Sequence, residues 1–294
     1  MDQKEWLTER FEENRARLRG VAYRMLGSLS EADDAVQETW LRLNRADAGA
    51  VENLAGWLTT VVARVCLDML RSRKSRREEP VDPRAPEPIA AGAAAIDPEQ
   101  EAMMADSVGL ALLVVLETLA PAERIAFVLH DLFAVPFDDI APIVQRSPDA
   151  ARQLASRARR RVRGTANVSA ADLASQRGTV ERFLAALRKG DVEGLVAVLD
   201  PDLVVRVDAA AATSGRPVEV RGARTWAAGA VAFAQMAQVT QLALVNGSVG
   251  LVLAPGGRLS RVLDVSIKDH RIARIDIVAD PERLQALDVA VIDW

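Results

Sequence analysis

The sequence predicts a multidomain protein in which two all-α domains, the second with a helix-turn-helix, precede a C-terminal α+β domain. Three observations along the 294 residues support this division. Residues 5–77 and 100–163 repeat apolar side chains at the period of an α-helix. Five prolines lie among alanines and acidic residues in 78–99, which is typical of a semi-rigid linker. After residue 176, short β-like runs and hairpin turns replace the helical pattern.

The composition is ordinary for a globular protein, with 50% hydrophobic and 27% charged residues. No run approaches the roughly 18 apolar residues of a membrane span, and the charged N-terminus lacks the apolar core of a secretory signal. The single cysteine, Cys66, excludes an internal disulfide and a thiolate metal cluster. We therefore expect a cytoplasmic protein that has no membrane contact, no metal and no cofactor.

The charge of the chain is unevenly distributed. The net charge of −4 argues by itself against nucleic-acid binding. Basic residues nevertheless cluster in 71–77 and again in 152–163, where only Asp149 opposes them locally. Two basic patches suit a protein that binds a polyanion at two places. Two solvated helix ends would give the same pattern.

The segment from Ser30 to Arg45 predicts an amphipathic helix, with Ser30 and Asp33 in capping-box spacing at its start. The face predicted to be buried holds Val36, Thr39, Trp40 and Leu43. The opposite face holds Asp34, Gln37, Glu38, Leu41 and Arg45. A leucine among carboxylates is what a docking surface for a basic partner needs, although a lone exposed leucine is also common.

A further helix is predicted from Trp57 to about Arg71. Its apolar side holds Leu58, Val61, Val62, Val65, Cys66 and Met69, so Cys66 is interpreted as a packing residue. Its polar side holds Trp57, Thr60, Arg64, Asp68 and Arg71. Arginine and aspartate can hydrogen-bond base edges, and tryptophan can stack on an unpaired base. An ordinary surface with an Arg64–Asp68 ion pair is the alternative.

Residues Pro136 to Arg163 predict a helix-turn-helix. A first short helix carries Phe137, Ile140, Ala141 and Val144, Gln145-Arg146 turns the chain, and Ser147-Pro148 caps the second helix. The second helix is predicted to bury Ala151, Leu154, Ala155, Ala158 and Val162. Its polar face holds Arg152, Gln153, Ser156, Arg157, Arg160 and Arg163. Arginine can read guanine and glutamine adenine in the major groove; a generic helical hairpin is the alternative.

The C-terminal part predicts helices over Val180 to Lys189 and Val192 to Leu199, followed by strands. The predicted strands are Leu203 to Val207, Leu242 to Val245, Val249 to Leu253, Arg261 to Ile267 and Ile272 to Val278. Asn246-Gly247 and Pro255-Gly256-Gly257 are predicted hairpin turns.

These motifs resemble a known family. Residues 33–43 (DDAVQETWLRL) resemble the polymerase-binding helix of sigma domain 2, and 56–68 resemble the segment that opens and reads the −10 element. Residues 107–163 resemble sigma domain 4, which reads the −35 element. The combination, without sigma domains 1 and 3, is similar to extracytoplasmic-function sigma factors. It implies domain 2 over 1–77, a linker over 78–106 and domain 4 over 107–165.

Residues 176–294 look like the SnoaL-like extension of the sigma-J type, a cone-shaped α+β fold related to NTF2-like proteins. Residues 241–247 carry this match, together with Asp280, Pro281, Glu282, Arg283 and Leu284, which are close to an Asn-Pro-Asp-Lys-Leu signature. In the linker, Pro86, Glu87 and Pro88 match a Trp-Leu-Pro-Glu-Pro motif whose first two residues are replaced here by Arg84-Ala85. Asp208, followed by four alanines, stands for an Asp-Gly-Gly-Gly-Lys motif.

The resemblance implies a promoter-recognition subunit that catalyses no reaction. Asp34, Gln37, Glu38 and Leu41 would dock on the β and β′ subunits of core RNA polymerase. Trp57, Arg64, Asp68 and Arg71 would contact the −10 element, and Arg152, Gln153, Ser156, Arg157 and Arg160 the −35 element of promoter DNA. The extension would be a regulatory module that contacts the sigma domains within the chain.

Two other functions of the C-terminal domain stay open. An enzyme that transfers a proton on a small hydrophobic molecule needs a carboxylate or histidine as acid or base. The candidates are Asp208, Asp264 and Asp276, whereas His270 lies in a predicted turn. A ligand-sensing domain would instead bind a small molecule in a pocket and thereby control the sigma domains.

Overall fold

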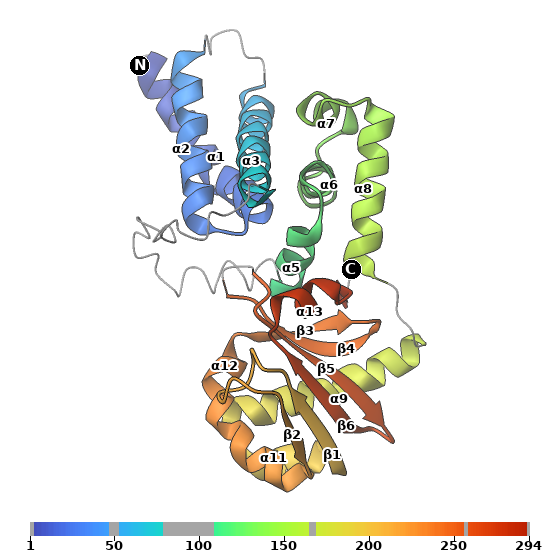
Figure 1. Ribbon diagram of the computed structural model, residues 1–294. Helices are drawn as coiled ribbons and strands as arrows, with labels where there is room; N and C mark the ends of the chain where they lie inside the picture. The colour runs from blue at the N-terminus through green and yellow to red at the C-terminus, as the bar shows by residue number, and fades with distance from the viewer. Residues whose placement is uncertain (1–2, 47–52, 79–108, 165–168, 256–257, 293–294) are drawn as a thin grey trace. The chain divides into compact units, whose positions relative to one another are not determined.

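The computed structural model describes residues 3–46, 53–78, 109–164, 169–255 and 258–292 (Figure 1). The chain forms two compact units. The first comprises Met1–Ser107 and Leu116–Arg159, and the second Val108–Val115 and Arg160–Trp294. Residues 79–108, and with them Pro86, Glu87 and Pro88 of the predicted linker motif, lie outside the described residues.

The first unit begins with three helices, α1 (Gln3–Leu26), α2 (Leu29–Arg45) and α3 (Leu54–Glu78), which pack against one another. The side chains buried between them include Phe11, Leu18, Tyr23, Met25, Leu29, Leu43 and Leu58. Gly27 adopts a left-handed φ of 73°, which lets the chain turn sharply between α1 and α2.

The start of α2 differs from the prediction. Ser28, not Ser30, caps this helix by accepting a hydrogen bond from the backbone N–H of Glu31 at 3.5 Å. The predicted capping role of Asp33 was wrong, because its carboxylate pairs with Arg19 at 2.7 and 3.0 Å. The turn at Gly27 reverses the chain early enough for α2 to begin at Leu29.

The next helices are α5 (Leu110–Thr118), α6 (Pro121–Phe127), the π-helix η2 (Val128–Leu132), α7 (Phe137–Val144) and α8 (Pro148–Arg163). The predicted helix-turn-helix is confirmed in α7 and α8. Gln145 takes the left-handed conformation in the turn, and the Ser147 hydroxyl accepts the backbone N–H of Ala150 at 3.2 Å. The predicted core residues Ala151, Ala155, Ala158 and Val162 are buried, and Leu154 is half-buried.

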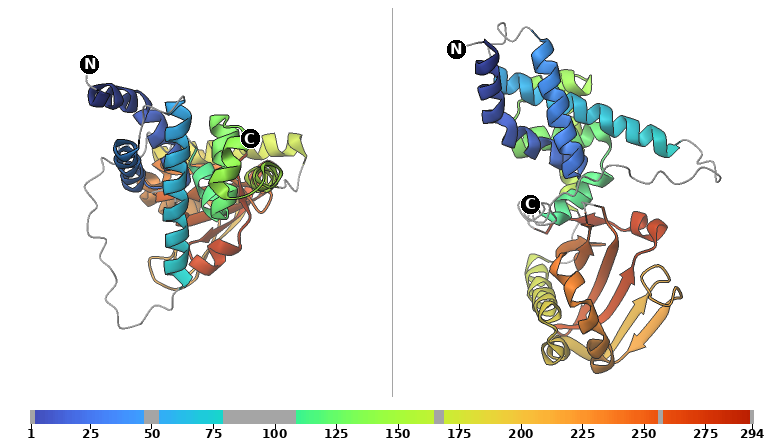
Figure 2. Two further views of the ribbon diagram at one scale, coloured as in Figure 1. Left: turned by 90° about the horizontal axis from the view of Figure 1, so that it is seen from above. Right: turned by 90° about the vertical axis from the view of Figure 1, so that its left-hand side faces the viewer.

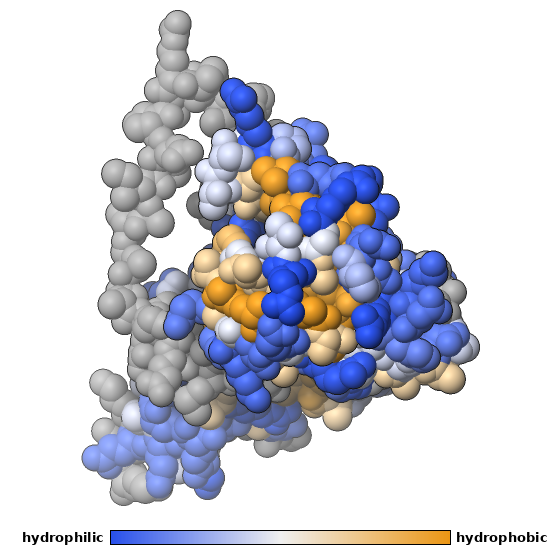
Figure 3. Space-filling view, turned by 90° about the horizontal axis from the view of Figure 1, so that it is seen from below, coloured by the Kyte–Doolittle hydropathy of each residue, from blue (hydrophilic) through white to orange (hydrophobic). Residues whose placement is uncertain are grey.

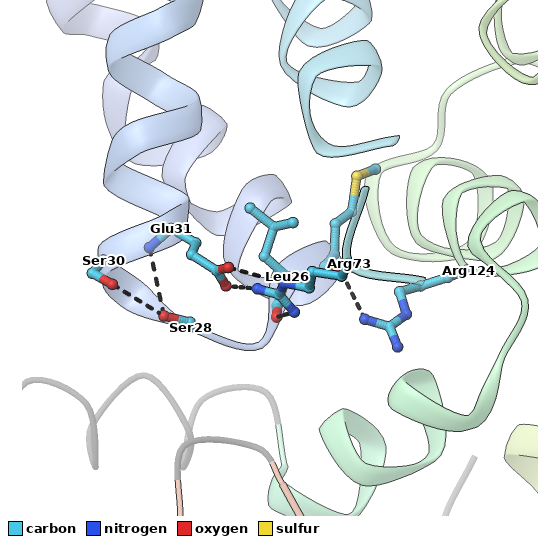
Figure 4. A network of polar contacts seen from close by, with 7 residues as sticks. Leu26, Ser28, Ser30, Glu31, Arg73 and Arg124 are labelled. Carbon is cyan, nitrogen blue, oxygen red and sulfur yellow. Dashed lines mark hydrogen bonds and ion pairs between the residues drawn. The ribbon is translucent and has the colours of Figure 1, made fainter. Parts of the chain in front are cut away.

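Arginines from two other helices hold the C-terminal end of α1 (Figure 4). Arg124 of α6, only 5% exposed, donates to the carbonyl oxygen of Met25 at 2.8 Å. Arg73 of α3 donates to the carbonyl of Leu26 at 3.1 Å and pairs with Glu31. The last carbonyls of a helix lack intrahelical partners, so guanidinium donors stabilise this end. Arg124 thereby joins α6 to the first three helices.

The second unit combines helices with a mixed seven-stranded sheet, which confirms the predicted α+β class. Its elements are α9 (Ala170–Lys189), α10 (Val192–Val198), β1 (Leu199–Val207), β2 (Val218–Arg221), α11 (Ala223–Ala230), η3 (Val231–Phe233), α12 (Ala234–Gln238), β3 (Thr240–Val245), β4 (Ser248–Leu253), β5 (Arg261–Lys268), β6 (Arg271–Val278), α13 (Pro281–Ala286) and β7 (Val289–Ala290). The strand order is β2-β1-β6-β5-β4-β3-β7, in which β1 and β6 are parallel and the other pairs antiparallel.

Helices α9, α10 and α11 cover one face of this sheet (Figure 2). The core between them includes Phe183, Leu195, Val205, Leu251 and Ile275, all buried. Phe183 stacks on Trp226 of α11 with ring centroids 5.7 Å apart. No helix in the described part of the chain is long and apolar enough to cross a membrane.

All five predicted strands are present, and Asn246-Gly247 forms the predicted hairpin turn with φ angles of 52° and 81°. Helix α9 begins ten residues earlier than predicted, because Ser169 caps it by accepting the backbone N–H of Asp172. The sequence did not predict β2, β7 or the helices of 223–238. Gly256 and Gly257 of the other predicted turn lie outside the described residues.

Candidate polymerase and promoter interfaces

The predicted docking residues lie on the solvent side of α2. Asp34 and Gln37 are exposed, Glu38 is half-buried, and Leu41 is 41% exposed. Glu38 accepts a hydrogen bond from Arg42 at 2.8 Å, so one of the carboxylates is already paired. The opposite side buries Val36, Thr39 and Leu43 and packs Trp40 on Phe11 with ring centroids 4.9 Å apart. Helix α2 therefore presents an acidic face with an exposed leucine.

The predicted −10 residues lie along α3. Arg64, Asp68 and Arg71 are exposed, and Trp57 is half-buried near the start of the helix. Within the described residues no ion pair joins Arg64 to Asp68. The alternative interpretation, an ordinary surface with this ion pair, was therefore wrong about the pair. Cys66 lies on the buried side, where burial raises the pKa of its thiol. That position agrees with its interpretation as a packing residue.

The predicted −35 residues all lie on the exposed side of α8. Arg152 pairs with Asp149 at 2.5 Å, and its guanidinium lies 5.4 Å from the ring centroid of Phe137. Arg157 donates to Glu123 of α6 at 2.7 Å. The side chains of Gln153 and Ser156 form no hydrogen bond in the part of the chain that the structure describes. These groups are free to meet base edges.

Two carboxylates remote in the sequence oppose the second basic cluster in addition to Asp149. Glu123 pairs with Arg157, and Asp131 of η2 pairs with Arg159 at 2.5 Å. Both carboxylates precede their arginines by about thirty positions, so local spacing in the sequence could not show these pairs. The ion pair between Asp149 and Arg152 could be predicted from the sequence, because the two residues are three positions apart on one helix.

Comparison with known proteins decides the family. Residues 10–76 match the model of sigma-70 region 2, and residues 109–162 match that of sigma-70, region 4. The chain is 37% identical over 286 residues to the ECF RNA polymerase sigma factor SigJ of Mycobacterium tuberculosis, covering 93% of this chain and 91% of the relative. The chain belongs to the ECF RNA polymerase sigma factors.

Two further comparisons also cover nearly the whole of both chains. The probable ECF RNA polymerase sigma factor SigI of Mycobacterium tuberculosis is 35% identical over 298 residues, covering 98% of both chains. The crystal structure of Mycobacterium tuberculosis SigJ has 35% identity, covers 94% of this chain and 98% of that one, and has a TM-score of 0.47. As an ECF sigma factor with regions 2 and 4, the chain recognises promoters for transcription initiation. The roles of single residues in this recognition stay predictions.

The second unit contains a cavity of about 320 Å³ between the sheet and the helices of 223–238. Its strand residues are Val207, Val218, Val220, Thr240, Leu251, Arg261, Leu263 and Ile277. Its helix and loop residues are Leu187, Ala211, Ala212, Thr213, Thr225, Trp226, Gly229, Ala230, Phe233, Met236 and Ala237. Sequence patterns did not indicate the walls of this cavity, because the alanine-rich segment 223–238 shows no clear helical period.

Asp208 is held as a structural carboxylate. It accepts the backbone N–H groups of Ala211 at 2.8 Å and of Ala279 and Asp280 at 3.0 Å, and it pairs with Arg283 at 3.4 Å. Burial acts to raise its pKa, but these donors and the charge of Arg283 outweigh burial, so the pKa lies below its ordinary value. A stably ionised carboxylate whose oxygens are already bonded is a poor catalytic base.

The other acid–base candidates do not line the cavity either. Asp264 accepts a hydrogen bond from Asn246 at 2.9 Å, and Asp276 pairs with Arg274 at 2.6 Å. The two aspartates lie opposite each other on β5 and β6, next to Leu263 and Ile277, which face the cavity. Because side chains alternate along a strand, both aspartates point to the other face of the sheet. His270 is exposed in the predicted turn.

The signature residues 280–284 form the first turns of α13. Asp280 caps the helix by accepting the backbone N–H of Arg283 at 3.0 Å, and Pro281 occupies its first position. Glu282 is exposed, and Leu284 is buried. Together with Asp208, the motif joins the loop after β1 to the loop after β6.

Proposed function

We propose that three faces of this chain guide core RNA polymerase to promoters. Helix α2 docks on the β and β′ subunits through Asp34, Gln37, Glu38 and Leu41. Helix α3 contacts the −10 element, and α8 contacts the −35 element. One observation carries the proposal: each helix buries its apolar side, and the predicted contact residues on its other side are exposed except for half-buried Glu38 and Trp57.

Duplex opening at the −10 element would be an exchange of binding energies. Unstacking a base costs a few kcal/mol, and stacking on an aromatic side chain returns about 1–3 kcal/mol. Trp57 is a candidate for this role because it is partly exposed near the start of α3, about two turns before exposed Arg64. No covalent bond changes, so the chain would need no catalytic group.

The C-terminal α+β domain would modulate the activity of the sigma domains within the same cytoplasmic protein. Support comes from its internal organisation, because its carboxylates are used in structural contacts and its cavity has no acid or base among the described lining residues. A regulatory module fits these observations better than an enzyme.

Run-off transcription with core polymerase and a cognate promoter tests the proposal. We expect the full chain to support initiation from that promoter. Leu41→Ala should weaken polymerase binding at least about tenfold, because a buried leucine contributes roughly 1.5–3 kcal/mol to an interface. Val239→Ala serves as the matched control, since Val239 is an exposed apolar residue of the other unit. Absence of promoter-specific transcripts would refute the function, and equal effects of both variants would refute the docking role of α2.

A further inference from the structure

The cavity of the second unit is apolar on most sides. Trp226, Phe233 and Met236 approach from the helices, and Leu251, Leu263 and Ile277 from the sheet. At its rim, Phe233 and Val218 stay 43% and 39% exposed. Figure 3 shows hydrophobic side chains gathered in the middle of the face seen from below, framed by hydrophilic ones. A hollow apolar area of this kind is typical of a binding site for a small molecule.

One cation lies in this apolar wall. Arg261, at the start of β5, is half-buried and lines the cavity. Its Nη1 lies 3.1 Å from the sulfur of Met236, and its Nη2 lies 3.5 Å from the carbonyl oxygen of Ala211. A thioether is a weak acceptor, and 3.5 Å is long for a hydrogen bond. None of the described residues supplies Arg261 with a carboxylate, so its charge is not neutralised within this part of the protein.

The cavity offers binding groups but no group for proton transfer. Apart from Arg261, the polar groups among its described lining side chains are the indole N–H of Trp226 and the hydroxyls of Thr213, Thr225 and Thr240. Thr240 donates to the carbonyl of Met236 at 2.9 Å. Arginine stays protonated and cannot serve as a base. The lining therefore favours reversible binding of a molecule over its chemical conversion.

We propose that this cavity binds a small apolar molecule with a single carboxylate, which pairs with Arg261. The apolar body lies between Trp226, Phe233 and the sheet. The inference names a ligand class for the regulatory domain, and its biological use rests on the function proposed above. A guanidinium presents two parallel N–H donors to a carboxylate, which makes this pair strong and directional.

The charge of Arg261 and the volume of the cavity limit the ligand further. A single cation balances a monoanion, whereas a phosphate monoester carries about −1.5 to −2 charges and would leave an excess in apolar surroundings. The cavity volume of about 320 Å³ lies at the small end of the ~300–1,000 Å³ that small-molecule sites occupy. A carboxylic acid of on the order of ten heavy atoms fits this volume.

Decanoate and the neutral decanol are matched probes for calorimetric titration of the full chain. We expect decanoate to bind at least about tenfold more tightly than decanol. Arg261→Met should remove this difference, and Arg261→Lys should keep part of it because lysine retains the charge. Arg224→Met is the control, since it removes an exposed arginine that pairs with Glu193. Equal affinities in the native chain, an unchanged ratio in Arg261→Met, or no binding would each overturn the proposal.

A second variant tests whether the probes bind inside the cavity. Gly229 of α11 lines it, and a Cβ atom added there meets no atom within 4 Å. Gly229 is exposed, so Gly229→Leu adds an apolar side chain at the open side of the cavity, and it improves helix propensity. Both probes should lose more than about tenfold in affinity while Tm holds or rises. Retained binding would locate the probes elsewhere and overturn the inference.

Calorimetry requires neither polymerase nor promoter, which separates the two proposals. Decanoate binding through Arg261 in a chain that fails to initiate transcription would refute the sigma mechanism alone. Promoter-specific transcription without decanoate binding would refute the ligand assignment alone.

Discussion

At the scale of single residues, Asp208 shows how one carboxylate can join distant parts of a domain. Its oxygens bind backbone N–H groups that follow it by 3, 71 and 72 positions. Asp208→Asn keeps the side chain's shape but removes the charge and replaces one acceptor with a donor. We expect the local free energy of opening to fall by about 1–3 kcal/mol at neutral pH. Hydrogen exchange at the amides of Ala279 and Asp280 measures this loss directly.

The effect of Asp208→Asn on local stability should depend on pH. The folded-state pKa of Asp208 is lowered, so its contribution to stability is fully present above the ordinary pKa of about 3.9 and is lost as the pH falls through the folded value. The difference between native and Asp208→Asn protection should therefore shrink below about pH 4. Asp264→Asn, which removes a carboxylate that accepts a hydrogen bond from Asn246, should leave both amides unaffected. A difference that stays constant down to pH 3 would contradict the role of the charge.

At the scale of elements, predictability follows the locality of the forces. The helix-turn-helix was predictable because Ser147-Pro148 and the apolar period of α8 lie within twenty residues. The polar faces of α2 and α3 were predictable for the same reason. Strands β2 and β7 were not, because short strands are specified by pairing with β1 and β3 rather than by their own residues. Arg157 and Arg261 likewise depend on partners remote in sequence.

The exposed face of α8 predicts two kinds of DNA contact. Gln153→Ala or Arg152→Ala should cost about 1–3 kcal/mol at particular base pairs of the −35 element. Arg163→Ala, at the end of the helix, should instead weaken binding to all sequences alike and reduce the salt dependence by about one ion. Anisotropy titrations of the holoenzyme with duplexes altered at one base pair distinguish the two patterns.

The control for this series is Arg146→Ala, an exposed arginine of the turn before α8. This variant tests whether the loss of any exposed arginine near α8 weakens DNA binding in the same way. Uniform weakening by Gln153→Ala across all duplexes would contradict direct reading of a base by that side chain.

At the scale of the whole molecule, the hydrogen bond from Arg124 to Met25 bears on the proposal that α3 and α8 contact two promoter elements at once. The −10 and −35 elements are about 25 base pairs apart, or roughly 85 Å at 3.4 Å per pair. A compact unit of about 150 residues has a radius of gyration of only about 15 Å. The roughly 30 residues between α3 and α5 can span about 100 Å when extended. If α3 and α8 contact the −10 and −35 elements as proposed, binding to a promoter requires that α6 leave the end of α1.

Removing the guanidinium should shift this equilibrium toward the open form. A hydrogen bond from a charged donor is worth about 1.5–3 kcal/mol, so Arg124→Gln should raise the open-to-closed ratio roughly 10- to 150-fold. Electron-spin distance measurements between labels at Glu9→Cys and Asp139→Cys, both exposed positions, report the separation. Cys66 can stay in place because it is buried and its thiol pKa is raised.

Arg73→Gln is the matched control for this shift. Arg73 donates to the neighbouring carbonyl of Leu26, but it belongs to α3 and so joins helices that match region 2 alone. Its loss should destabilise that region without lengthening the distance between the labels. Longer distances in Arg124→Gln than in Arg73→Gln would show that the bond to Met25 holds the regions together. Identical distance distributions in the native chain and Arg124→Gln would mean that the contact does not govern opening, and that the cost of separation lies in other parts of the interface, such as the stacking of Arg24 on Phe133 at 5.3 Å.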